Sequence, residues 1–147
     1  MKSLDKLILS GNIISGTIAS SIGNLSRLEM LHLGDNNISG TITATIGDLA
    51  SLESLEFHSN MLTGEIPDTI GSLSELRAMI LNDNGIHGSI PVFMNKLVKL
   101  EYLDLGNNNL SGSIPSSLDQ LLQLGETSRN MITLVCDNCS GTVYFRF

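Results

Sequence analysis

GNNNLSGSIP, residues 106–115, is the stretch that decides the fold of this chain. By composition it is a loop, because Asn, Gly, Ser and Pro are the residues that dominate turns. Leu110 and Ile114 do not fit a solvated loop. Stepping back by 24 residues finds related stretches: NDNGIHGSIP (82–91), HSNMLTGEIP (58–67), GDNNISGTIT (34–43) and SGNIISGTIA (10–19). The stretch is therefore one copy of an internal repeat.

Five repeats, numbered 1 to 5 below, cover 4–27, 28–51, 52–75, 76–99 and 100–123 of the 147 residues. The first position is always Leu, the fourth and sixth are apolar, the thirteenth is always Gly and the fifteenth always Ile. The ninth position is always Asn, in the residues Asn12, Asn36, Asn60, Asn84 and Asn108. This uniformity predicts that each repeat forms one coil of a solenoid.

A short strand is expected at the start of each coil, since the fourth and sixth residues share one face of an extended chain. Strands of successive coils should pair in parallel at a spacing of about 4.8 Å. The Asn side chain can both donate to and accept from turn groups of adjacent coils, which would otherwise be buried unpaired. One coil cannot bury its apolar faces alone, but a stack of coils can.

The pattern LxxLxLxxNxLSGxIPxxIGxL resembles the plant-type 24-residue leucine-rich repeat of receptor-like proteins, receptor kinases and polygalacturonase inhibitors. The resemblance implies an α/β solenoid, shaped as a right-handed horseshoe or superhelix. A parallel sheet would line its concave side, with 3₁₀ turns on the convex side and a short second sheet near the SGxIP segment. Ala19 and Thr43 replace the proline in the first two repeats, which should soften their convex side without removing the coil.

We expect 1–147 to form a single leucine-rich-repeat domain in which 124–147 is a degenerate coil or C-terminal cap. Ile132 and Leu134 are its expected strand residues, and TVYFRF (142–147) should be irregular or strand-like. Cys136 and Cys139 form a lone C-x₂-C, too few ligands for a zinc site. Because caps of the family often contain cysteines, we expect a possible capping disulfide or two thiols.

Repeat 1 opens at Leu4 with no coil in front of it. An end coil exposes its apolar face and needs a cap. Two explanations remain open: the chain is a fragment of a longer solenoid, or a neighbouring chain covers this end. As part of a longer receptor-like protein it would be extracellular or membrane-associated.

The bulk composition excludes several functions. The formal charge is −7, which argues against nucleic acid as a partner, because phosphate binding needs clustered Lys and Arg. The apolar runs are far shorter than the ~20 residues of a transmembrane helix. The glycines recur at the repeat period and form no phosphate-binding loop, and no serine lies in a nucleophile motif. We expect no enzyme activity and no cofactor.

Candidate binding residues are the outward third, fifth and seventh positions of each strand, which vary while the scaffold is constant. Regularly spaced side chains on a rigid sheet suit recognition of a protein or peptide, which is also what the family resemblance implies. The candidate residues are Lys6, Ile8, Met30, His32, Glu56, His58, Ile80, Asn82, Tyr102 and Asp104. The alternative function is that of a structural subunit held within a larger protein assembly.

A separate candidate site consists of His32, Glu56 and His58, because two imidazoles and a carboxylate could bind zinc and support metal-assisted hydrolysis. The simpler interpretation is a polar patch in which the rings pack or pair with the carboxylate. No residues to orient the rings are evident in the sequence, so we expect no metal at this position.

Overall fold

Five short parallel strands, one per repeat, form the main sheet of the solenoid. The computed structural model describes residues 3–116, 118, 133–134 and 143–144. Neighbouring strands pair in unbroken register, so that each residue lies beside the residue 24 positions along the chain. The strands, in spatial order, are β1 (Lys6–Ile8), β3 (Met30–His32), β5 (Ser54–Glu56), β7 (Ala78–Ile80) and β9 (Tyr102–Asp104).

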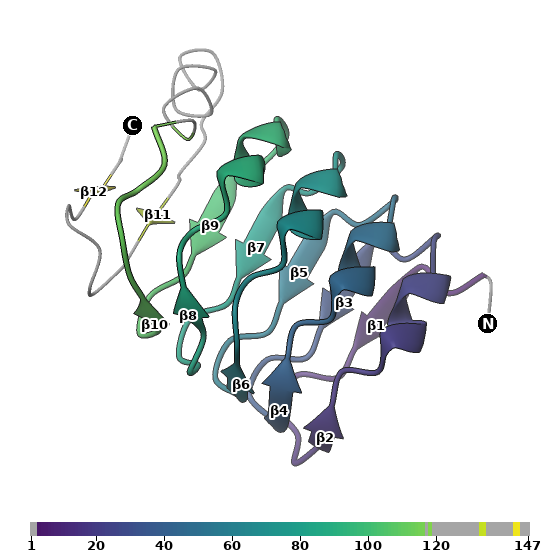
Figure 1. Cartoon of the computed structure of the whole chain (residues 1–147). Helices are drawn as coiled ribbons and strands as arrows, with labels where there is room; N and C mark the ends of the chain where they lie inside the picture. Colours follow the sequence, from purple (N-terminus) through teal and green to yellow (C-terminus); the bar gives the residue numbers. More distant parts are fainter. Residues whose placement is uncertain (1–2, 117, 119–132, 135–142, 145–147) are drawn as a thin grey trace.

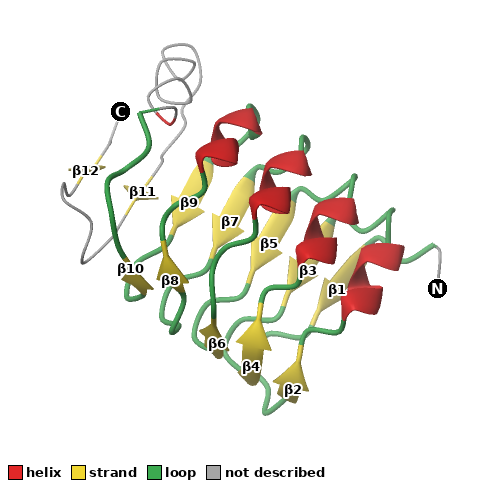
Figure 2. Ribbon diagram, viewed as in Figure 1, coloured by secondary structure: helices red, strands yellow, loops and turns green. Residues whose placement is uncertain are grey.

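Behind the main sheet each coil continues into a second strand and then, in the first four repeats, into a 3₁₀ helix (Figure 1). The second strands are β2 (Ser15–Thr17), β4 (Asn37–Thr41), β6 (Met61–Thr63), β8 (His87–Gly88) and β10 (Asn109–Leu110). The helices are η1 (Ser20–Asn24), η2 (Ala44–Asp48), η3 (Asp68–Ser72) and η4 (Val92–Lys96). In Figure 2 the helices stack on the side opposite the main sheet. The solenoid predicted from the repeat is therefore confirmed, with a parallel main sheet, 3₁₀ turns and a short second sheet, which is divided between β6 and β8 into a three-stranded part and a two-stranded part.

The core lies between the main sheet and the helices and consists of stacked columns of apolar residues, mostly Leu and Ile. The middle residue of each main strand points inward, and from repeat 2 onward it is fully buried or nearly so. Phe57 replaces Leu in the sixth-position column and has an exposed fraction of 0%. In repeat 1, by contrast, the sixth and eleventh positions, Leu9 and Ile14, remain 38% and 37% exposed.

The ninth-position asparagines join consecutive coils through their side chains. Nδ2 of Asn84 donates to the carbonyls of Leu81 and Asn82 in its own coil, and to that of Phe57 in the preceding coil at 3.0 Å. Its Oδ1 accepts the backbone N–H of Leu62 at 2.9 Å. Asn36, Asn60 and Asn108 make the same four bonds. Asn12 makes only the two bonds within its own coil, to Leu9 and Ser10.

The missing prolines of the first two repeats leave the backbone unchanged. Ala19 and Thr43 have φ/ψ of −69/139° and −66/142°, against −68/141° at Pro67, and each is followed by a 3₁₀ helix. The coil is retained, as expected from the sequence. The reason is that inward apolar residues and inter-coil bonds set the turn, and proline only pre-selects a φ that other residues also reach.

Two short strands follow the five repeats, β11 (Thr133–Leu134) and β12 (Val143–Tyr144), and they pair antiparallel. β11 also lies beside β9. Leu134 is thus in a strand as expected, and the TVYFRF segment contributes Val143 and Tyr144. Ile132, Cys136 and Cys139 lie outside the described residues, so the disulfide and the cap remain predictions.

Glycine at the twentieth position of a repeat lets adjacent 3₁₀ helices pass closely. A Cβ at Gly47 would lie 2.5 Å from the carbonyl oxygen of Thr69 and 2.8 Å from its Cβ. Backbone cannot move aside as a flexible side chain can, so we expect Gly47→Ala to lower the free energy of unfolding by about 1–3 kcal/mol. Urea denaturation measures this loss. Asn95→Ala at the same position of repeat 4 is the control, since a side chain is already accommodated there; equal effects of both changes would contradict the close-passage explanation.

Candidate binding surface on the main sheet

The outward side of the main sheet, called the concave face below, carries all ten candidate residues. Eight of them belong to the main strands, and His58 and Asn82 follow β5 and β7 by two residues. Lys6 and Ile8 are exposed and the other eight are half-buried. The fifth-position column runs across the five strands as Ile8, His32, Glu56, Ile80 and Asp104.

His32 points from β3 towards β5. Its Nε2 lies 2.8 Å from the hydroxyl of Ser54 and 3.4 Å from Oε1 of Glu56. The side chain of His32 is 12% exposed, so this group is held against the sheet rather than extended into solvent. The arrangement fixes a polar patch at the centre of the face.

His58 turns in the opposite direction, back towards repeat 2. Its ring covers Gly34, where a Cβ would lie 2.3 Å from the ring atom Cε1. Its Nε2 lies 3.4 Å from Oδ2 of Asp35. His58 is therefore paired with Asp35 and not with Glu56, and the two imidazoles are held by two different carboxylates.

Amides and carboxylates form a second polar group at the far side of the face. Both oxygens of the Asp83 carboxylate accept hydrogen bonds from side-chain amides. Asn107 donates to Oδ1 at 2.7 Å and Asn82 donates to Oδ2 at 2.5 Å. Asp104 accepts the backbone N–H of Gly106 at 2.9 Å. These contacts order the side chains before any ligand arrives, which reduces the entropy lost on binding.

One edge of the face is formed by the second position of each repeat, which is acidic in every repeat except repeat 4, where it is Arg77. Arg77 pairs with Glu101, and Asp5 lies 3.8 Å from Arg27. Glu29 and Glu53 are exposed neighbours in the same column. The backbone N–H of Glu53 donates a hydrogen bond to the carbonyl of Glu29. A positively charged group would be attracted to this edge.

The zinc hypothesis can be compared with this geometry. In the part of the chain that the structure describes, no group of three or more His, Cys, Asp and Glu residues is placed to hold a metal ion. His32 and His58 use Nε2 for contacts with separate carboxylates.

Among the described helices, none has the length and apolar character that crossing a bilayer would require.

Sequence reasoning missed Asp35 and Asp83, which lie at the eighth position of their repeats. This position turns the chain out of the main strand with positive φ, 53° at Asp35 and 56° at Asp83. The signal was present in the column itself, which reads Gly11, Asp35, Ser59, Asp83 and Asn107. Gly, Asp and Asn are the residues that best tolerate the left-handed region.

The comparisons with known proteins agree with this architecture. Family models described as leucine rich repeat match residues 2–62 and 99–121. The comparison with curated proteins found no match.

Solved structures that resemble the chain include three plant ectodomains. One is the leucine-rich-repeat ectodomain of the membrane receptor kinase GASSHO1/SCHENGEN3 from Arabidopsis thaliana, in complex with CASPARIAN STRIP INTEGRITY FACTOR 2. It is 36% identical with a TM-score of 0.82, over 91% of this chain and 15% of that one. The ectodomain of the Arabidopsis thaliana receptor kinase SOBIR1 is 31% identical with a TM-score of 0.79, over 90% and 69%. The ectodomain of the Arabidopsis receptor kinase HAESA, in complex with an IDA peptide hormone ligand, is 36% identical with a TM-score of 0.78, over 95% and 22%.

The chain thus spans 15% of the GASSHO1/SCHENGEN3 ectodomain and 22% of that of HAESA, but more than two thirds of that of SOBIR1. The family models, the 24-residue coils and these similarities agree. The chain belongs to the leucine-rich-repeat family and is of the plant type.

Proposed function

We propose that this chain is a non-catalytic recognition module that binds a protein or peptide through its concave face, as part of a receptor-like protein. The observation that carries the proposal is the contrast between scaffold and surface. Inward columns keep an apolar residue in every coil, whereas the register aligns outward columns whose members differ in charge and polarity from strand to strand. Surface variation on a fixed backbone is what a specific binding site requires.

The contacts within the concave face support the same proposal. His32, Glu56 and Ser54 are held to one another, and His58 is held to Asp35, so polar groups are presented in fixed positions. Ile80 lies beside Glu56 in the register, and Tyr102 follows one strand further along the sheet; both are half-buried. Tyr is one of the residue types that are enriched where the binding energy of an interface is concentrated.

The charge of the face favours a ligand with basic groups. Glu29 and Glu53 are exposed at one edge of the face, and Glu56 and Asp104 lie in the fifth-position column. The HAESA ectodomain is in complex with a peptide hormone ligand, which supports a receptor-like role over an inhibitor-like one. Placement outside the cell or at a membrane follows as part of this proposal.

Peptides selected from a displayed library for their binding to the chain are the probe for a test. We expect a variant with Glu56, His58, Tyr102 and Asp104 all changed to Ala to bind the selected peptides at least about tenfold more weakly. The control changes Asp48, Asp68, His87 and Phe93 to Ala, which removes the same kinds of side chain from the second sheet and the 3₁₀ helices. Isothermal titration calorimetry gives both affinities, and circular dichroism checks folding. Loss of binding by the control alone would move the site away from the concave face.

The second candidate, a structural subunit, is favoured by one observation, the exposure of large apolar side chains such as Ile13, Met61 and Val98. It requires that the purified chain associates with other chains. A monodisperse monomer in analytical ultracentrifugation would argue against it.

A further inference from the structure

Repeat 4 differs from the repeats before it on the outward side of its 3₁₀ helix. At the seventeenth, eighteenth and twenty-third positions, repeats 1 to 3 carry only Ser, Thr, Ala or Asp. Repeat 4 carries Val92, Phe93 and Val98 there, and it has Lys96 at the twenty-first position, where the earlier repeats have Asn, Asp and Ser. These four residues, called the η4 patch below, interrupt columns that are small or polar in the three earlier coils.

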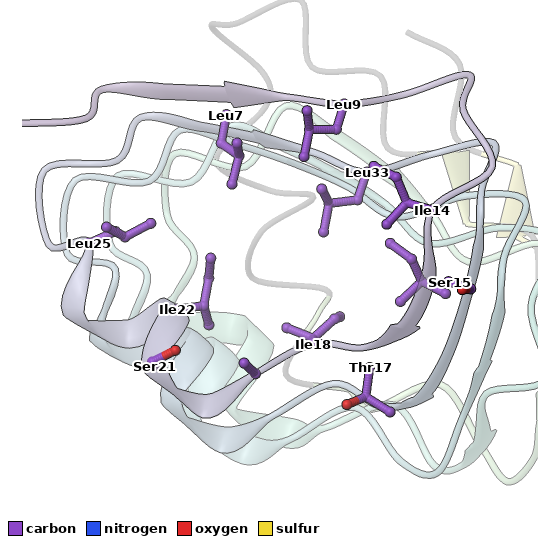
Figure 3. Close-up of a pocket in the computed structure, with 12 residues that line it drawn as sticks. Leu7, Leu9, Ile14, Ser15, Thr17, Ile18, Ser21, Ile22, Leu25 and Leu33 are labelled. Atoms are coloured by element: carbon purple, nitrogen blue, oxygen red, sulfur yellow. The ribbon is translucent and has the colours of Figure 1, made fainter. Parts of the chain in front are cut away.

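The apolar members of the η4 patch are exposed, with fractions of 56% for Val92, 40% for Phe93 and 58% for Val98. In repeat 1, by contrast, the partly exposed Leu9 and Ile14 belong to inward positions and line a hollow of about 330 Å³ in the interior of the coil (Figure 3). The η4 patch lies at outward positions, so its exposure does not come from a gap in the core. Large apolar side chains that are exposed together commonly mark an interaction site.

Phe93 occupies a position that joins consecutive coils in the repeats before it. Thr45 and Thr69 hold this position in repeats 2 and 3, and their hydroxyls donate to the carbonyls of Ser20 at 2.8 Å and Ala44 at 2.7 Å in the preceding coil. A phenyl ring cannot donate such a hydrogen bond. Phe93 therefore replaces an inter-coil bond by a ring that stays partly in solvent, which a role in binding explains better than a role in packing.

Lys96 gives the η4 patch a positive charge. Its Nζ lies 4.9 Å from the centroid of the Phe93 ring, which is a cation–π contact. Within the described residues Lys96 forms no ion pair, whereas Lys99 pairs with Glu75 at 2.5 Å. A carboxylate that approaches the patch thus meets a lysine whose charge is not already neutralised.

We propose that the η4 patch is a docking site for an acidic segment of another protein, in which an apolar side chain is flanked by carboxylates. The apolar side chain covers Val92, Val98 and the exposed part of Phe93, and a carboxylate pairs with Lys96. The chain has a formal charge of −7, so carboxylates meet mostly like charge elsewhere, and Lys96 fixes where the segment binds. The site lies on the opposite side of the core from the concave face and stands independently of the function proposed for that face.

An anionic membrane surface fits the η4 patch less well. The helices stack beside one another along one side of the solenoid (Figure 2), so a flat bilayer resting on η4 would also approach η2 and η3. Asp48 of η2 and Asp68 of η3 are exposed and would be repelled by anionic headgroups. A narrow peptide segment can contact η4 without approaching either carboxylate.

Two displayed peptide libraries test the proposal, one with random apolar cores between Asp and Glu flanks and one with the same cores between Lys flanks. We expect the chain to select binders from the acidic library. The variant Val92→Ser, Phe93→Thr, Lys96→Ser and Val98→Ser should bind them at least about tenfold more weakly in isothermal titration calorimetry. Each new residue occurs at the same position of an earlier repeat, so the variant should keep the fold, which circular dichroism checks.

Controls separate the η4 patch from the concave face. The variant with Glu56, His58, Tyr102 and Asp104 changed to Ala should bind the acidic peptides as the original chain does. Any peptides selected from the Lys-flanked library should be unaffected by the changes in the η4 patch. Acidic peptides that lose affinity with the concave variant instead would place their site on the concave face and overturn the proposal.

Lys96→Glu tests the charge of the η4 patch while the apolar side chains stay in place. It should weaken the acidic peptides at least about tenfold and abolish the loss of affinity that added salt causes in the original chain. The absence of binders in the acidic library, or binding that survives both η4 variants, would overturn the proposal. Anionic lipid vesicles that bind the chain through the patch would identify a membrane as the occupant, and a dimer that the η4 variant disrupts would identify a second copy. Either result would also overturn it.

Discussion

Phe57→Ala is expected to be among the most destabilising single substitutions in this chain, lowering the free energy of unfolding by about 3–5 kcal/mol. Phe57 is fully buried in the sixth-position column and is the largest fully buried side chain among the residues that the structure describes. It lies in repeat 3, with coils on both sides. Its carbonyl accepts hydrogen bonds from Asn60 in the same coil and from Asn84 in the next coil, which hold the backbone so that it cannot collapse into the cavity. Urea denaturation followed by circular dichroism measures the change.

Two variants make the Phe57 prediction specific. Phe57→Leu restores the residue that the other four repeats carry and should cost no more than about 1.5 kcal/mol. Leu9→Ala removes a side chain from the same column in repeat 1, where it is 38% exposed, and should cost far less than Phe57→Ala. A large loss at Leu9 and a small one at Phe57 would contradict the burial that the structure assigns to them.

Asn84→Ala is expected to lower the free energy of unfolding by roughly 2–5 kcal/mol, although it removes a polar side chain. The substitution removes the acceptor of the Leu62 N–H, and it leaves the carbonyl of Phe57 with its bond from Asn60 alone. Each buried polar group left unpaired costs about 1–3 kcal/mol, which exceeds the gain from removing the amide. The loss therefore comes from the backbone groups that Asn84 connects, not from the side chain alone.

Asn12→Ala is the matched control for Asn84, because it is the same residue at the same position of repeat 1 with only its two local bonds. It is exposed, so water replaces the lost amide and the expected cost is below about 1 kcal/mol. Equal losses at the two positions would show that the local turn bonds, rather than the inter-coil bonds, carry the stabilisation.

Much of this architecture could be predicted from the sequence because the same spacing of apolar residues, Asn and Gly recurs in five consecutive repeats. Spacing alone placed Leu31 and Leu55 in one buried column and His32 beside Glu56 in one outward column. Such predictions need only the period of a strand and the parallel stacking of identical coils. The second sheet and the 3₁₀ turns were implied by the family resemblance.

The details of the concave face could not be predicted in the same way. The direction in which a side chain leans depends on the room its neighbour leaves, and His58 turns back because Gly34 has no Cβ in its way. Its partner Asp35 belongs to a turn position that the strand pattern does not include. The part of the chain beyond repeat 5 does not follow the period, so the same reasoning had no pattern to extend.

Localising a bound ligand tests the central claim most directly. A ¹⁵N-labelled chain titrated with a peptide selected from the displayed library should show its largest amide shift changes at His32, Glu56, Tyr102 and Asp104, on the main strands β3, β5 and β9. Amides of η1–η4 should change little, since they lie on the opposite side of the core. Shift changes confined to η1–η4 or to the second sheet would contradict the assignment of recognition to the concave face.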